Sequence, residues 1–191
     1  MPTPSKEKKI LELFFNEPTR HWKFGEIRKK IRISDSKLSK WLAKLTKDKI
    51  VSRLKKKGKM PVYIGNYDAP EYQNTKRIFG LNMLHEAGLL NHLASLSKAK
   101  QVILFGSFNH GDWHKDSDID IFIFGDDSEF DETEYSRKLH REIQLFSCKN
   151  RKEYEQLGEG LIKNIFLGDI IKGDLQFLEV SFNAKPNQDI Q

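Results

Sequence analysis

Two aspartates within an apolar run place the strongest constraint on how this chain can fold. Residues 118–125 are DIDIFIFG, so Asp118 and Asp120 stand one residue apart. Side chains alternate between the faces of a β-strand, which puts both acids on one face, about 7 Å apart along the strand, and Ile119 and Ile121 on the other. Two carboxylates so placed repel each other unless a cation lies between them. Because Mg²⁺ binds one or two carboxylates together with phosphate oxygens, the pattern predicts a divalent cation site, for Mg²⁺ or Mn²⁺.

A turn of small residues precedes this strand. Residues 102–105, VILF, predict a short buried strand that ends in Gly106 and Ser107. Glycine lets the backbone approach an anion closely, and a serine hydroxyl can hydrogen-bond a phosphate oxygen. We therefore expect Gly106 and Ser107 to hold the phosphates of a nucleotide, with the cation between these phosphates and the two aspartates.

Charge is distributed unevenly between the two parts of the chain. Residues 1–66 hold 19 Lys and Arg against 6 Asp and Glu, a net charge of +13, whereas residues 67–191 hold 14 against 21, a net charge of −7. Such asymmetry indicates that one part binds a polyanion while the other has a different role. A solvated basic surface is the alternative interpretation.

The basic part also has a clear pattern of elements. Ile10, Leu13 and Phe14 have helical spacing, two further segments repeat it, and Ser34 can cap the third helix. A basic hairpin follows. The pattern predicts helices at residues 5–15, 21–31 and 34–47, a strand at 50–54, a basic turn at 55–59 and a strand at 62–64.

Three short helices followed by a basic hairpin resemble a winged helix-turn-helix domain. The resemblance implies binding to double-stranded DNA, with the third helix in the major groove and the hairpin turn along phosphates. A protein-interaction module is the alternative use of this fold. The residues that the resemblance assigns to DNA contact are Ser36, Lys37, Lys40, Lys44, Arg53, Lys55, Lys56, Lys57 and Lys59.

The acidic part resembles the nucleotidyltransferase superfamily related to DNA polymerase beta, in its minimal form. Its signature is Gly-Ser, about ten residues, then Asp-x-Asp in an apolar strand, which here is Gly106-Ser107 and Asp118-Ile119-Asp120. Ser117 also stands where the family has a serine, and it joins Gly106 and Ser107 as a nucleotide-binding candidate. The resemblance implies a catalytic metal site at Asp118 and Asp120. It also implies transfer of a nucleoside monophosphate from a nucleoside triphosphate to an acceptor hydroxyl.

One position departs from the family. A third carboxylate normally lies on a later strand, and here that strand is expected at residues 142–148, after a helix at about 132–141. The expected acid position is occupied by Gln144, whose neutral amide cannot act as a general base and is a poor metal ligand. Glu142 lies two residues earlier on the same strand face and is the candidate replacement, although a surface role for it remains open.

Together these features predict an α+β protein with a winged helix at residues 1–66, a helical connector at 67–97, and a mixed α/β nucleotidyltransferase domain at 98–191 with a small sheet flanked by helices. Cys148 is the only cysteine and no run of 18 apolar residues occurs, so we expect a soluble cytoplasmic protein without a membrane span. A regulator that binds nucleotide without turnover is the competing hypothesis. The resemblance adds a third, an antitoxin that modifies a helical toxin protein. A homodimer is left open.

Overall fold

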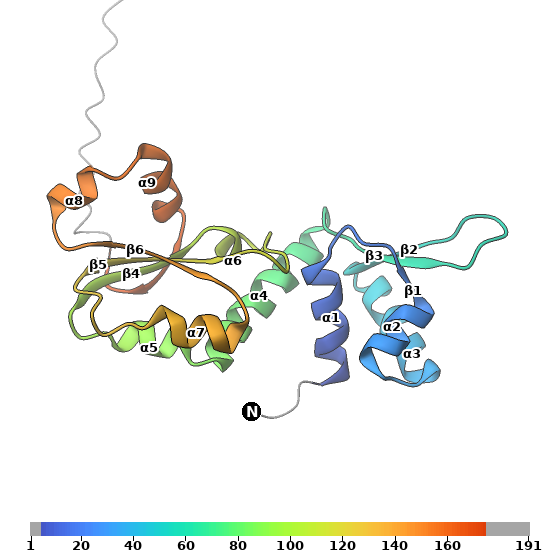
Figure 1. Ribbon diagram of the computed structural model, residues 1–191. Helices are drawn as coiled ribbons and strands as arrows, with labels where there is room; N and C mark the ends of the chain where they lie inside the picture. Colours follow the sequence, from blue (N-terminus) through green and yellow to red (C-terminus); the bar gives the residue numbers. More distant parts are fainter. Residues whose placement is uncertain (1–4, 175–191) are drawn as a thin grey trace, which may run out of the picture.

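The structure is a computed structural model, and it describes residues 5–174. Its elements form two units joined by a long helix (Figure 1). The helices are α1 Lys6–Asn16, α2 Phe24–Ile31, α3 Asp35–Lys47, α4 Pro70–Glu86, α5 Leu89–Ser95, α6 Ser107–His110, α7 Glu132–Leu139, α8 Arg151–Glu155 and α9 Glu159–Phe166. The strands are β1 Trp22–Lys23, β2 Val51–Leu54, β3 Val62–Gly65, β4 Ala99–Phe105, β5 Ile119–Gly125, β6 Ile143–Cys148 and β7 Asp169–Lys172.

The N-terminal unit contains the three helices and the hairpin that the sequence predicts. Leu38, Leu42 and Leu45 of α3 are buried, as expected for the apolar face of an amphipathic helix. The sequence did not indicate β1, which pairs with β3 to give a three-stranded antiparallel sheet in the order β1-β3-β2. A two-residue strand is too short to show any periodicity of its own, and the pairing of Trp22 with Tyr63 defines it.

The second unit is built on a four-stranded sheet in the order β6-β5-β4-β7. β5 and β6 are parallel and are joined through α7, while the other pairs are antiparallel. Ile119, Ile121 and Ile123 pack in the same buried cluster as residues of α5 and α7. Phe122 and Phe124 pack on the opposite face, with residues of α8 and α9. The predicted alternation is therefore confirmed.

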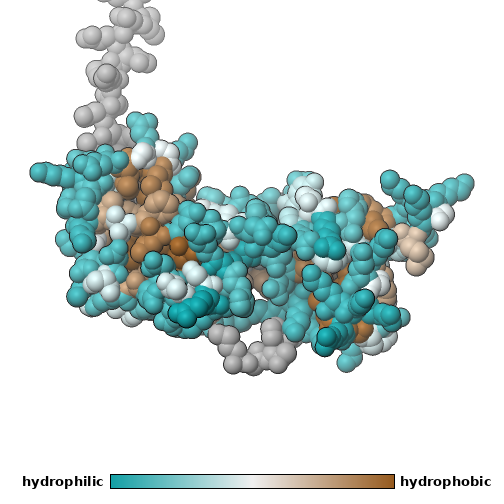
Figure 2. All heavy atoms as spheres, viewed as in Figure 1, coloured by the Kyte–Doolittle hydropathy of each residue, from teal (hydrophilic) through white to brown (hydrophobic). Residues whose placement is uncertain are grey.

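Helices lie on both faces of this sheet. In Figure 1, α5 and α7 lie on one side of the sheet and α8 and α9 on the other. Hydrophobic residues gather at the surface near α9 and β6 in Figure 2. The partly buried ones include Phe146, Leu161 and Phe166. Within residues 5–174, no helix is long and apolar enough to cross a membrane.

Some expected boundaries shift by a few residues. The helix expected at 132–141 ends at Leu139, because His140 adopts the left-handed conformation with φ of 53°. β6 then begins at Ile143, so Glu142 immediately precedes the strand. The predicted nucleotidyltransferase domain extends to residue 191, so its end at residues 175–191 lies outside the described residues.

α4 belongs to the core of both units. The Tyr72 hydroxyl of α4 donates a hydrogen bond of 2.8 Å to the carbonyl of Phe14 in α1. The neighbouring Phe15 meets Tyr72 and Phe79 edge to face, with ring centroids 5.2 and 5.3 Å apart. Edge-to-face pairs of this kind add to the free energy of burial. The hydrophobic core therefore runs without a break from α1 through α4 to the four-stranded sheet.

Trp113, in the loop between α6 and β5, completes this junction. Its ring stacks on Phe108 with centroids 5.2 Å apart and also contacts Phe15 and Phe79. A Cβ atom built on Gly80 of α4 would lie 2.8 Å from the indole nitrogen of Trp113. The loop that leads to Asp118 thus packs directly against α4 and α1.

We expect Gly80→Ala to destabilise the protein by about 1–3 kcal/mol, the usual cost of overpacking a core. Gly25→Ala is the matched control, since Gly25 is also helical but a Cβ atom there would meet nothing within 4 Å. That change should be neutral or stabilise by up to about 1 kcal/mol. Equilibrium denaturation of both variants tests the difference, and equal effects would contradict the close packing of α4 on Trp113.

Candidate active site

The backbone of Gly106 packs closely against the side chain of Asp120. Phe105 pairs with Asp120 across β4 and β5, and Gly106 follows with φ of 72°, in the left-handed region. A Cβ atom on Gly106 would lie 2.1 Å from Oδ2 of Asp120. Only glycine therefore leaves room for this carboxylate. Ser107, expected in a turn, is the first residue of the short helix α6.

Asp118 and Asp120 form a pair with an electrostatic penalty. Burial raises the pKa of Asp120, and the negative charge of Asp118 raises it further. A divalent cation would remove this penalty, and two carboxylates with all-oxygen chemistry suit Mg²⁺. No group of three or more His, Cys, Asp or Glu side chains suited to a metal ion occurs within residues 5–174. The candidate metal site therefore consists of two protein carboxylates.

Gln144 lies in the position that the sequence analysis singled out. It is the register partner of Asp120 on the parallel strand β6, and its Nε2 donates a hydrogen bond of 2.7 Å to Oδ2 of Asp118. An ionised carboxylate can only accept, so the amide nitrogen must be the group that faces it. Glu142 is exposed, and its backbone carbonyl accepts from the amide of Ile119. Gln144, rather than an acid, therefore lies beside Asp118.

The sequence analysis did not identify Arg141, whose side chain links the loop before Asp118 to the N-terminal unit. Its guanidinium donates to the backbone carbonyls of His114 and Ser117 and, at 2.8 Å, to Oδ1 of Asn16 at the end of α1. The Ser117 hydroxyl accepts from the backbone amide of His114. The backbone of Lys115 also donates to the Asn16 carbonyl, at 3.0 Å. The loop before Asp118 is therefore held by both units.

The guanidinium of Arg141 is also enclosed by aromatic rings. It lies 5.1 Å from the centroids of both Phe108 and Trp113. Cation–π contacts of this kind stabilise a guanidinium that is partly removed from water. Burial lowers the pKa of Arg141, although the group remains charged at every ordinary pH. Hydrogen bonds and aromatic contacts of Arg141 therefore both hold this loop.

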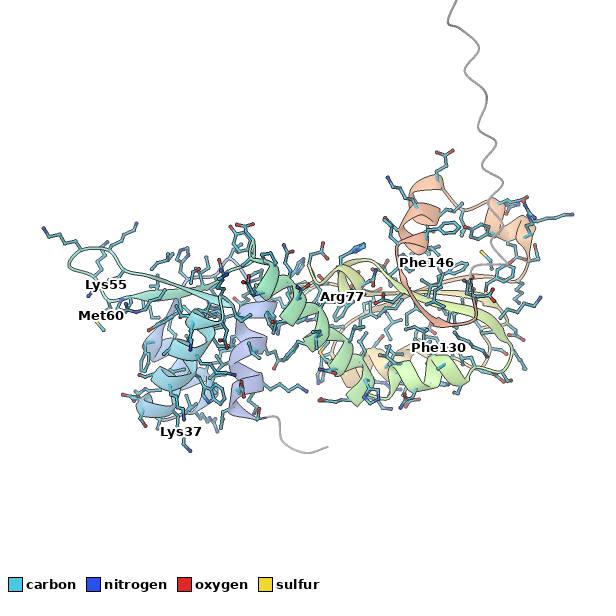
Figure 3. All side chains as sticks on the ribbon, turned by 180° about the vertical axis from the view of Figure 1, so that it is seen from behind. Lys37, Lys55, Met60, Arg77, Phe130 and Phe146 are labelled. Atoms are coloured by element: carbon cyan, nitrogen blue, oxygen red, sulfur yellow. The ribbon has the colours of Figure 1, made fainter. Side chains whose placement is uncertain are left out.

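The residues that the winged-helix resemblance assigns to DNA contact are all exposed. In Figure 3, Lys37 of α3 and Lys55 at the hairpin turn lie at the end of the N-terminal unit away from the four-stranded sheet. Lys44 differs from them, because its ammonium pairs with Glu7 of α1 at 3.3 Å. Lys44 therefore lies on the side of α3 that faces α1.

A comparison with protein families supports the acidic part of the sequence analysis. The model of the nucleotidyltransferase domain family matches residues 87–171, a little less than half of the chain. The match includes Gly106, Asp118 and Asp120, and it supports a transferase that acts on a nucleotide. It also includes α5, which the sequence analysis assigned to the connector. A comparison with curated proteins found no match.

The raised pKa of Asp120 gives a prediction about stability. The folded chain keeps the Asp120 proton to a higher pH than the unfolded chain, so ionisation of Asp120 costs stability as the pH rises above about 4. Without metal, Asp120→Asn should therefore raise the thermal midpoint at pH 7, and this gain should disappear near pH 3.

Asp126→Asn is the matched control at the other end of the same strand. Hydrogen bonds from Ser128 lower the pKa of Asp126, so loss of this carboxylate should not raise the midpoint at pH 7. Thermal denaturation of both variants at the two pH values measures the effect. A large fall in the midpoint for Asp120→Asn at pH 7 would show that the Asp120 carboxylate is structural.

Proposed function

We propose that this protein is a divalent-cation-dependent nucleotidyltransferase that moves a nucleoside monophosphate from a nucleoside triphosphate to an acceptor hydroxyl. The observation on which the proposal rests is the arrangement of Gly106, Asp118 and Asp120. Two carboxylates that repel each other lie side by side at a position where only glycine makes room for Asp120. The family match over residues 87–171 supports the same class of reaction.

Each residue has a separate task in the proposed reaction. Asp118 and Asp120 would hold Mg²⁺ or Mn²⁺, whose contribution when bound is to offset the negative charge of the phosphates. Ser107 would donate a hydrogen bond to a phosphate oxygen, and Gly106 would keep Asp120 in place. The acceptor oxygen forms a bond to the α-phosphorus while the bond from that phosphorus to the bridging oxygen breaks. Pyrophosphate leaves with the bond electrons.

The acceptor proton has two candidate destinations. Glu142 could take it, although its carboxylate lies at the exposed start of β6. Otherwise the proton passes to solvent, because Gln144 has no basic group to offer. Chemistry would then depend mainly on positioning and electrostatics rather than on a protein base.

The hydrogen bond from Gln144 to Asp118 favours a second candidate function. An amide that donates to Asp118 already occupies one of the lone pairs that a metal would use, and it lowers the need for a cation. The domain could then bind a nucleotide as a signal without turnover, as part of a DNA-binding regulator. Modification of a helical toxin protein, the third hypothesis, would use the same site as the enzyme and differ only in its acceptor.

Pyrophosphate release from each nucleoside triphosphate with Mg²⁺, with and without duplex DNA, tests the enzyme. Asp118→Asn and Asp120→Asn should each reduce turnover by at least about 100-fold, the scale on which a preorganised electrostatic group acts. Asp116→Asn is the matched control, since Asp116 is an exposed acid in the same loop, and it should retain activity.

Two further variants locate the third carboxylate. If its absence limits turnover, Gln144→Asp should raise the rate, whereas Glu142→Gln should abolish it if Glu142 is the base. Fast wild-type turnover that survives Glu142→Gln would show that no third carboxylate is required. Nucleotide binding without any pyrophosphate release would favour the second candidate function, a regulator that binds a nucleotide as a signal.

We also propose that the N-terminal unit is a winged helix that binds double-stranded DNA. The support is the net charge of +13 over residues 1–66 and the exposure of the basic residues on α3 and the hairpin. Ser36, Lys37 and Lys40 would face base edges, and Lys55, Lys56, Lys57 and Lys59, with Arg53, would lie along phosphates.

DNA binding should be strongly dependent on salt, because each lysine that contacts a phosphate releases a bound counterion. Joint replacement of Lys55, Lys56 and Lys57 by Ala should weaken binding about equally for all sequences and flatten the salt dependence. The full chain should be used, since α1 shares its core with α4. Replacement of Lys149, Lys152 and Lys163, three exposed lysines of the other unit, is the control. Binding that does not change with salt would contradict the proposal.

A further inference from the structure

A pocket of about 390 Å³ lies where the N-terminal unit, α4 and the α6 loop meet. Pro18 and Thr19 line it from the loop after α1, Gln73 and Lys76 from α4, and Asp112 from the loop after α6. Its volume is within the range of small-molecule sites in proteins. It is formed by three separate segments of the chain.

One of the residues that line the pocket is a buried cation. Lys76 is 2% exposed, and its ammonium lies 5.0 Å from the ring centroid of Trp113 and 5.6 Å from that of Tyr72. Within residues 5–174, this ammonium forms no hydrogen bond and no ion pair. Lysine is almost never fully buried unless it is paired, because an unpaired charge is costly to remove from water. The two rings compensate for only part of that cost.

The surroundings of Lys76 change the pKa of its ammonium group. Burial lowers its pKa to about 8, the nearby Asp112 carboxylate raises the pKa, and Arg141 lowers it. At pH 7 most of the molecules still carry the charge. The pocket therefore presents a positive group that feels the charge of Asp112 but forms no direct ion pair within residues 5–174.

The exposed residues on the pocket lining restrict which ligand could pair with the Lys76 ammonium. Asp68 and Asp112 are exposed on its lining, together with Thr19 and Gln73. A ligand that placed negative charge near these two carboxylates would be repelled, whereas hydroxyl or amino groups could donate to them. The complementary ligand is thus anionic at one end and carries hydrogen-bond donors along the rest.

We propose that this pocket is a binding site for a small hydroxylated or amino-bearing anion, whose phosphate or carboxylate group pairs with Lys76 and whose donors face Asp68 and Asp112. The proposal uses none of the residues that would bind the nucleotide. It is therefore independent of whether the protein transfers nucleotides.

Isothermal titration of the full chain with glucose 6-phosphate, gluconate and uncharged glucose tests the site, with inorganic phosphate as a fourth probe. We expect one or both of the hydroxylated anions to bind, glucose to bind at least tenfold more weakly, and phosphate to bind more weakly than glucose 6-phosphate. A preference between glucose 6-phosphate and gluconate distinguishes a phosphate ligand from a carboxylate ligand.

Three variants locate the binding. Lys76→Met should weaken it at least tenfold, while Lys163→Met, at an exposed lysine of α9, should leave it unchanged. Gln73→Trp keeps Lys76 and places a large side chain on the pocket lining, so it too should weaken binding. It decides the question if Lys76→Met does not fold. Binding that is equally tight in Lys76→Met or Gln73→Trp would overturn the proposal, as would no binding of either anion at millimolar concentration.

Discussion

The packing of Trp113 against Phe15, Phe79 and Phe108 is the contact on which the arrangement of the whole molecule depends. These rings come from α1, α4 and α6 and from the loop that leads to β5, so they join segments of both units. Trp113 also makes cation–π contacts with Arg141 and Lys76, and Phe108 makes one with Arg141. Aromatic packing therefore positions the acid-bearing strand, the loop before it and the pocket at the junction.

Within the candidate active site, geometry and electrostatics act in opposite directions. Gly106 makes room for Asp120, while burial and the charge of Asp118 make its ionised form unfavourable. The amide of Gln144 relieves part of this conflict by donating to Asp118. A bound cation would relieve it more completely. Under the proposed function, the balance between cation and amide would decide whether the domain transfers a nucleotide or only binds it.

The sequence predicted the features that depend on local pattern. Alternation placed Asp120 on the face of β5 opposite to Ile121, and the family resemblance singled out Gln144, which lies beside Asp118. The contacts of Arg141 were beyond such reasoning, because its partner Asn16 lies 125 residues away. Lys76 was missed for a related reason. Lysine is a polar residue in the sequence, and this one becomes buried only in the folded chain, where Tyr72 and Trp113 lie close to it.

The shared core also has a consequence for how this chain can change in length. Tyr72 contacts α1, and Gly80 contacts Trp113 from the same helix, eight residues or about two turns further on. A single residue inserted between them would turn one contact by about 100° relative to the other. An insertion that is harmless in a flexible linker would here separate the two units, so helical phase, more than linker length, restricts insertions and deletions between Tyr72 and Gly80.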